Sequence, residues 1–193
     1  MLNKIIYLRM PKILTNRNTL LKASLKVFLK NGYYHTSFQD LAKACNIKKS
    51  HFYYYFSNKE DLMKEVLMYA HAYVKKKIFS LADQENKSAK ERLNEILNQI
   101  KQLYYNHHYG CLMGNTLLEL SGKEPNIEKV ITSYFDDFKQ TLTSIYKEKN
   151  ASEAPEILAN DTIAKLHGNI MFMKLYKDHS YLENATKQIL EQF

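Results

Sequence analysis

The segment from Gly32 to Leu62 constrains the fold of this chain more than any other, because it combines two helix-start signals with a tight turn. Ahead of it, apolar residues at helical spacing predict a first helix that ends at Asn31-Gly32. Thr36, followed three residues later by Gln39, forms a capping box and predicts the start of a short second helix. Asn46 tolerates a left-handed backbone, so we expect a tight turn there.

Two more helices follow this turn. A third short helix is expected from about Lys48 to Tyr55, and a capping box at Ser57 to Glu60 predicts the start of a long fourth helix. Two short helices joined by a tight turn, with a longer helix in front, are the parts of a helix-turn-helix module. The second short helix of such a module enters the major groove of DNA.

The rest of the chain continues the helical pattern. Apolar residues recur at helical spacing through residues 62–73, 93–103, 127–142, 163–171 and 182–193, and no alternating strand pattern competes with them. The stretches that resemble linkers are short, at residues 83–88, 121–126 and 147–155. We therefore predict an all-α protein of about nine helices.

Positive charge is concentrated in the first third of the sequence. Residues 1–62 contain 11 Lys or Arg and 3 Asp or Glu, a net charge of +8, whereas residues 63–193 contain 17 of each kind. A basic helical module on a neutral body is typical of a protein that binds a polyanion. Together with the helix-turn-helix spacing, this distribution predicts binding to double-stranded DNA.

Composition limits where the protein acts. Only two cysteines are present, Cys45 and Cys111, which are too few for a disulfide framework and favour the reducing cytoplasm. No apolar stretch is long enough to span a bilayer, and no signal peptide is evident, so we expect no membrane partner.

The predicted recognition helix supplies two kinds of DNA contact. Residues at its start, where such helices touch base edges, are expected to read the sequence. Residues at the flanks of the module are expected to bind phosphates and so position it. The first group is Lys48, Lys49, Ser50 and His51, and the second is Thr36, Tyr53, Tyr54 and Lys59.

The stretch from Leu20 to Leu62 resembles the N-terminal domain of the TetR family of bacterial transcriptional regulators. The matching positions, within about residues 15–65, are Phe28, Gly32-Tyr33, Thr36-Ser37, Leu41-Ala42, Ile47, Tyr53, Phe56 and Lys59-Glu60. Three positions depart from the family pattern: Asn46 stands in place of Gly in the turn, Lys48 replaces a capping Ser, and Ser50 replaces a small Gly. Base contacts therefore cannot be copied from relatives.

The resemblance implies both an organisation and a mechanism. We expect a DNA-binding domain at residues 11–57 and a larger effector-binding and dimerisation domain at residues 58–193. The family implies a homodimer through the last two helices that binds a near-palindromic operator, usually as a repressor. A small-molecule effector would release it, and the resemblance does not say which compound.

Aromatic and sulfur-containing side chains of the second domain are candidates for the effector pocket, which needs apolar walls with a few polar groups. These candidates are Tyr104, Tyr105, Cys111, Met113, Tyr134, Phe138, His167 and Met171.

Cys111 leaves an alternative open, because it is expected to begin a helix, where a thiol becomes more reactive. It could serve a thiol-based redox sensor or a cysteine-dependent enzyme with His107 or His108 as base, although no catalytic signature is present. His107, His108 and Cys111 lack an evident fourth ligand, so we expect no metal site, no catalytic residue and no cofactor. A third possibility is an architectural or RNA-binding helical protein.

Overall fold

The computed structural model describes residues 16–105, 108–149 and 154–193. Within these ranges the chain forms nine α-helices and one short 3-10 helix, η1, and contains no strand, which confirms the all-α prediction. The predicted start of the DNA-binding domain, at residue 11, lies outside the described residues. The helices are α1 (Arg17–Asn31), α2 (Phe38–Cys45), α3 (Lys49–Tyr55), α4 (Lys59–Lys77), η1 (Phe79–Asp83), α5 (Ala89–Tyr105), α6 (Leu112–Leu120), α7 (Pro125–Tyr146), α8 (Pro155–Tyr176) and α9 (Ser180–Gln192).

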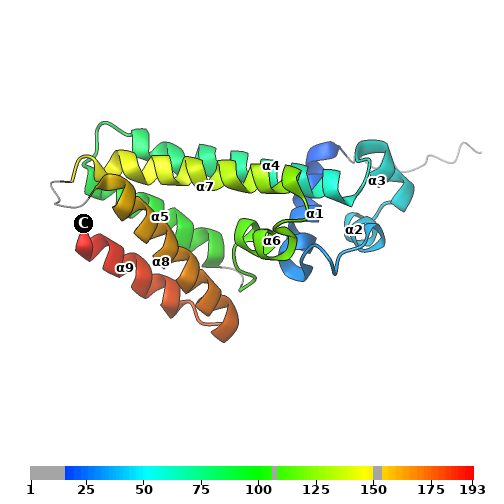
Figure 1. Cartoon of the computed structure of the whole chain (residues 1–193). Coiled ribbons are helices and arrows are strands. Elements are labelled where there is room, and N and C mark those ends of the chain that lie inside the picture. The colour runs from blue at the N-terminus through cyan, green and yellow to red at the C-terminus, as the bar shows by residue number, and fades with distance from the viewer. Residues whose placement is uncertain (1–15, 106–107, 150–153) are drawn as a thin grey trace, which may run out of the picture.

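The first three helices form a small unit at one end of the molecule (Figure 1). Both predicted capping boxes are displaced by one residue. Ser37, not Thr36, caps α2, and its hydroxyl accepts from the N–H of Asp40 while the Asp40 carboxylate accepts from the N–H of Ser37. Asn58, not Ser57, caps α4 by accepting from the N–H of Asp61, whose carboxylate accepts from the N–H of Ser57. Thr36 and Ser37 are adjacent, and both residue types can cap a helix. Because the Thr36 side chain is buried, Ser37 caps α2 instead.

The two predicted turns have the expected signs of backbone torsion. Asn46 closes α2 with φ 52° and ψ 45°, which is the left-handed conformation expected of it. Gly32 ends α1 with φ 80° and ψ 175°, a combination open to glycine alone. Lys48 precedes α3 without a side-chain hydrogen bond to the helix, in agreement with its lack of a capping oxygen.

The second part of the molecule is a helical body in which the long helices α4 and α7 run side by side, with α5, α8 and α9 beneath them (Figure 1). Leu62 and Val66 of α4 are buried, as predicted, but Tyr73 is 51% exposed. Leu103 of α5, also predicted to face inward, is 37% exposed. Both differences arise beside a cavity described below, where neighbouring helices do not close over these side chains.

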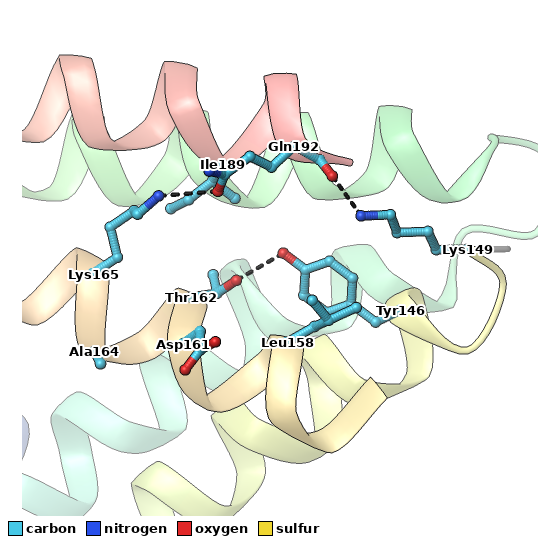
Figure 2. Close-up of a pocket in the computed structure, with 9 residues that line it drawn as sticks. All are labelled: Tyr146, Lys149, Leu158, Asp161, Thr162, Ala164, Lys165, Ile189 and Gln192. Carbon is cyan, nitrogen blue, oxygen red and sulfur yellow. Dashed lines mark hydrogen bonds between the residues drawn. The ribbon is translucent and has the colours of Figure 1, made fainter. Parts of the chain in front are cut away.

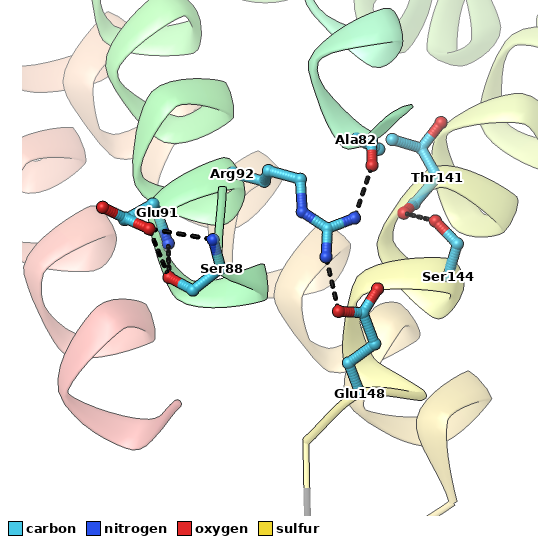
Figure 3. Close-up of polar contacts among 7 residues, drawn as sticks. All are labelled: Ala82, Ser88, Glu91, Arg92, Thr141, Ser144 and Glu148. Carbon is cyan, nitrogen blue, oxygen red and sulfur yellow. Dashed lines mark hydrogen bonds and ion pairs between the residues drawn. The ribbon is translucent and has the colours of Figure 1, made fainter. Parts of the chain in front are cut away.

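A buried arginine ties the body together at the end remote from α1–α3. Arg92 of α5 donates to the carbonyl of Ala82 in η1 at 2.7 Å and to the Glu148 carboxylate that follows α7 at 2.5 Å (Figure 3). Its side chain is only 9% exposed, so both partners are needed to compensate for its desolvation. Sequence reasoning gave no role to this residue.

Candidate DNA interface and effector cavity

The start of α3 presents a continuous polar surface to solvent. Lys48, Lys49, Ser50 and His51 are all exposed, as a base-reading helix requires. Tyr53 and Tyr54 on the next turn are 53% and 83% exposed. Six of the eight predicted DNA contacts are therefore exposed, on α3 or directly before it.

The opposite side of α3 is held by aromatic packing. Phe52 is fully buried, and its ring lies 5.7 Å from that of Phe38 on α2 and 6.2 Å from that of Phe56. Arg17 at the start of α1 covers Phe56, with its guanidinium carbon 4.9 Å from the ring centroid, and donates to the Glu65 carboxylate of α4. This packing fixes the direction in which Lys49 and His51 project.

Two of the predicted phosphate contacts face inward instead. Thr36 is 1% exposed, and its hydroxyl donates to the carbonyl of Gly32 at 2.7 Å. The Lys59 ammonium donates to the carbonyls of Tyr33 and Thr36 at 2.9 and 3.0 Å, and desolvation lowers its pKa. In this structure both side chains support the loop between α1 and α2, and a phosphate would compete with those bonds.

An apolar cavity of about 150 Å³ lies between α1 and the helical body. Tyr104, Cys111, Met113 and Tyr134 of the predicted effector set line it. Nothing in the sequence indicated that α1 contributes to the cavity wall. For two lining residues of α4, Tyr69 and Tyr73, the apolar spacing of that helix was a signal. The additional lining residues include Leu25 and Leu29 of α1, Tyr69 and Tyr73 of α4, and Leu103 of α5.

The other predicted pocket residues divide into two groups. Phe138 and His167 line a narrower space of about 10 Å³ that shares Tyr104 and Tyr134 with the apolar cavity. Tyr105 and Met171 line neither space, and they are 61% and 56% exposed. Here the structure differs from the expectation, because these two side chains lie on solvent-facing sides of α5 and α8.

Cys111, which lines the apolar cavity, lies close to His167, which lines the narrower space beside it. Cys111 is 7% exposed. Both residues lie beside Gly114, because a Cβ atom at that position would be 3.7 Å from Cys111 Cβ and 3.9 Å from His167 Cδ2. Nδ1 of His167 lies 3.0 Å from the carbonyl of Ile163. Its Nε2 is buried and forms no hydrogen bond of ordinary geometry among the described residues.

The two groups shift one another's ionisation. Burial raises the pKa of the Cys111 thiol, but interaction with His167 outweighs that effect, and the net pKa is lowered. Burial lowers the pKa of His167, and the nearby thiol reverses this, so that its net pKa is raised. The pairing favours a thiolate beside an imidazolium.

Of the two bases proposed from the sequence, His107 lies outside the described residues, and the ring contact of His108 is not with Cys111. His108 packs on His179, with ring centroids 4.2 Å apart. Among the residues that the structure describes, no group of three or more His, Cys, Asp or Glu side chains could hold a metal ion. None of the described helices is both long and apolar enough to cross a membrane.

A larger hollow of about 540 Å³ lies between α7, α8 and α9 at the far end of the body. Figure 2 shows Lys165 donating to the side chain of Gln192 at 3.0 Å and Lys149 donating to its backbone carbonyl. Tyr146 and Thr162 share a hydrogen bond of 2.7 Å. Its polar groups are largely bonded to one another, and it lies far from α1–α3, so the apolar cavity is the better effector candidate.

The outer face of α8 carries a row of exposed apolar side chains. Phe172 and Tyr176 are 41% and 59% exposed, and both rings pack on Tyr181 of α9 at 5.6 and 5.4 Å. Gly168 lies within this helix with open space beside it. Ile157, Met171 and Leu175 extend the face, each at least 49% exposed.

Comparison with known proteins identifies the family. A family model described as bacterial regulatory proteins of the tetR family matches residues 20–66, and one described as tetracyclin repressor-like C-terminal domain matches residues 89–189. An uncharacterized HTH-type transcriptional regulator in the lacX 3' region of Lactococcus lactis subsp. lactis is 27% identical over 183 residues, which is 87% of this chain and 89% of that protein.

Two further similarities extend over nearly the whole chain. The HTH-type transcriptional repressor DhaR of Mycobacterium sp. (strain GP1) is 25% identical over 181 residues, covering 91% of this chain and 90% of DhaR. The crystal structure of a TetR transcriptional regulator from Legionella pneumophila has a TM-score of 0.84 at 25% identity, covering 93% of this chain and 98% of that one. With its helix-turn-helix unit, helical body and matches to both domains, the chain belongs to the TetR family of DNA-binding transcriptional regulators.

Proposed function

We propose that this protein is a ligand-responsive repressor that binds a near-palindromic operator as a homodimer. The observation that carries the proposal is the exposed start of α3, where Lys49, Ser50 and His51 project from a helix fixed by buried Phe52 and Phe56. Side chains at the start of a recognition helix read base edges, while flanking groups such as Tyr53 bind the backbone. Its target DNA would place its action in the cytoplasm.

The exposed face of α8, continued by α9, is the proposed dimer interface. An apolar row of this length is unusual on the surface of a monomer and suits burial against a second copy. Two-fold symmetry would then present two α3 helices to successive major grooves. The open space beside Gly168 would allow the helices to approach closely.

The proposed effector is a small and mainly apolar molecule that enters the cavity beside Tyr104 and Cys111. Leu25 and Leu29 of α1 and the α4 side chains Tyr69 and Tyr73 share this cavity, so an occupant would contact both units of the protein. A ligand that fits a different spacing of the two units lowers operator affinity, and by linkage the operator lowers the affinity for that ligand.

Selection from random duplex DNA tests this function directly. The expected product is a two-fold symmetric sequence whose half-sites lie about one helical turn apart. Sedimentation of the complex should give two chains per duplex. Recovery of sequences without two-fold symmetry, or binding by a single chain, would show that the proposed mode is wrong.

A second function is favoured by the contact between Cys111 and His167. We propose that Cys111 is also a reactive thiol, through which modification inside the cavity changes DNA affinity. Alkylation by iodoacetamide forms a sulfur–carbon bond and expels iodide, and the thiol proton passes to His167 or to water. Loss of operator binding after alkylation of the wild-type protein, but not of the Cys111→Ser variant, is the expected result. Equal loss in both would assign the effect elsewhere, for example to Cys45.

A further inference from the structure

The loop that joins α1 to α2 is bound by a side chain from the body. Glu119, near the end of α6, accepts hydrogen bonds from the backbone N–H groups of Tyr33 and Tyr34 at 2.8 and 3.1 Å. Hydrogen bonds to a carboxylate are stronger than those between neutral groups. This contact joins the helix-turn-helix unit to the body through residues that are far apart in sequence.

Gly32 makes this close approach possible. A Cβ atom at this position would lie 2.5 Å from Oε1 of Glu119, so the carboxylate would have to move away from its present position. Its φ of 80° also disfavours any side chain. Glycine is therefore favoured by its torsion angles, and it also leaves room for the carboxylate to bind the loop.

A second charged group binds the same loop. The Lys59 ammonium of α4 donates to the carbonyls of Tyr33 and Thr36, and lies 4.3 Å from the centroid of the Tyr33 ring. The loop is thus bound by an anion through its N–H groups and by a cation through its carbonyls. Because Ser37 caps α2 directly after this loop, its position sets the position of α2 and α3.

Helix α6 connects this contact to the cavity. Cys111, Leu112 and Met113 at its start line the cavity, and Glu119 lies in its last turn. At about 1.5 Å per residue, the helix rises by roughly 10 Å from Leu112 to Glu119. In Figure 1, α6 lies between α1 and the rest of the body.

From these contacts we infer that Glu119 is a positioning residue for operator binding: it fixes the orientation of the helix-turn-helix unit on the body, and thereby the distance between the two α3 helices of a dimer. The inference depends on the proposed dimeric binding of an operator. Glu119 touches no DNA, so it acts on the spacing of the half-sites rather than on their sequence.

Hydrogen exchange tests the contact without DNA. In the wild-type protein the amides of Tyr33 and Tyr34 should be protected, and Glu119→Gln should speed their exchange by roughly tenfold or more, since a charged acceptor is replaced by a neutral one. Glu128→Gln is the matched control, because Glu128 accepts from the N–H of Gly122 within the body itself. Unprotected Tyr33 and Tyr34 amides in the wild-type protein would overturn the inference before any variant is made.

Operator spacing then separates positioning from mere support. Binding is measured to the selected operator and to a version with a few base pairs inserted between its half-sites. Wild-type protein and Glu128→Gln should discriminate strongly between the two, and Glu119→Gln should reduce the ratio by roughly tenfold. If exchange accelerates while the ratio is unchanged, Glu119 only supports the loop and the inference fails.

A second variant guards against loss of folding. Glu119→Asp keeps the charge but withdraws it by one methylene, and it should change both measurements in the same direction as Glu119→Gln. Opposite effects of the two variants would contradict the inference. If wild-type protein selects no two-fold operator, the proposed function fails, and that result is obtained before either variant is compared.

Discussion

The two parts of the molecule use tyrosine in opposite ways. On α3, Tyr53 and Tyr54 are 53% and 83% exposed and stand beside lysines. In the body, Tyr104 and Tyr134 are 6% and 7% exposed, and desolvation raises the pKa of both. The hydroxyl groups of Tyr53 and Tyr54 are open to a charged partner such as DNA, whereas those of Tyr104 and Tyr134 lie in the wall of the apolar cavity. Environment, rather than residue type, decides what the side chain does.

Truncating one tyrosine from each part should give the largest difference. Tyr134→Ala should lower the free energy of unfolding by about 3–5 kcal/mol, because it opens a cavity beside Phe79 and Phe138. Tyr54→Ala should change it by less than about 0.5 kcal/mol. Urea unfolding followed by circular dichroism measures both. Similar losses in the two variants would remove the distinction between the tyrosines.

For DNA binding, variants on the surface of α3 should have the larger effects, and the residues of α3 should differ in whether the effect depends on the DNA sequence. Lys49→Ala or His51→Ala should cost about 1–3 kcal/mol on the preferred operator and much less on operators changed at the contacted base. Tyr53→Phe, which removes only a hydroxyl, should weaken binding to all sequences alike. Fluorescence anisotropy on a panel of operator variants would show this. A uniform loss for His51→Ala would move it to the class of phosphate contacts.

The contact between Cys111 and His167 is expected to have a smaller effect, which depends on pH. Interaction with His167 lowers the pKa of Cys111, so His167→Gln should raise that pKa and slow alkylation by iodoacetamide at neutral pH. The rate should fall by about tenfold for each pKa unit regained. Mass spectrometry of the Cys111 peptide across pH values gives the rate. Cys45, whose pKa is raised by burial, provides an internal reference that should not respond.

The smallest effect concerns the support of Tyr134. Its ring meets that of His71 at 5.5 Å, and His71 contacts the Asp137 carboxylate at 2.9 Å. Hydrogen bonding to Lys75, followed by that to His71, lowers the pKa of Asp137. Its stabilisation is therefore present above the unfolded pKa of about 3.9 and is lost as pH falls through the lower folded value.

Replacing this carboxylate should abolish that pH dependence. Asp137→Asn should reduce stability at neutral pH by about 1 kcal/mol or less, since the pair is partly exposed, and should have little effect below pH 3 or so. Thermal unfolding of both proteins between acidic and neutral pH measures the difference. An equal difference at every pH would mean that packing, rather than charge, is responsible.

Local signals in the sequence predicted most of the fold. Helical spacing and the turn at Asn46 predicted the helix-turn-helix unit, and the linker expected at residues 147–155 ends where α8 begins. The caps were displaced by one residue because neighbouring Thr36 and Ser37 are both suitable, and only tertiary packing buries one of them. Short-range patterns identify an element more reliably than its first residue.

The candidate sites were less accessible from the sequence, because they depend on contacts between distant segments. Cys111 and His167 are 56 residues apart in the sequence, so the sequence offered no reason to pair them, whereas the structure brings them together. Lys59 stands in the first turn of α4, where an outward, anion-binding orientation was expected, but the carbonyls of Tyr33 and Thr36 draw its ammonium inward. These carbonyls converge only after the loop has folded.

The contact of Glu119 with the loop after α1 also bears on the exchange of domains between relatives. Because the carboxylate binds backbone N–H groups, it is indifferent to which side chains follow at positions 33 and 34. Position 32 is restricted by its positive φ, and a Cβ atom there would also displace the carboxylate. A DNA-binding domain from a relative, joined to this body, should therefore form the same contact with Glu119 if it carries glycine at that position, whatever operator it reads. Hybrids that lack this glycine should lose the contact with Glu119.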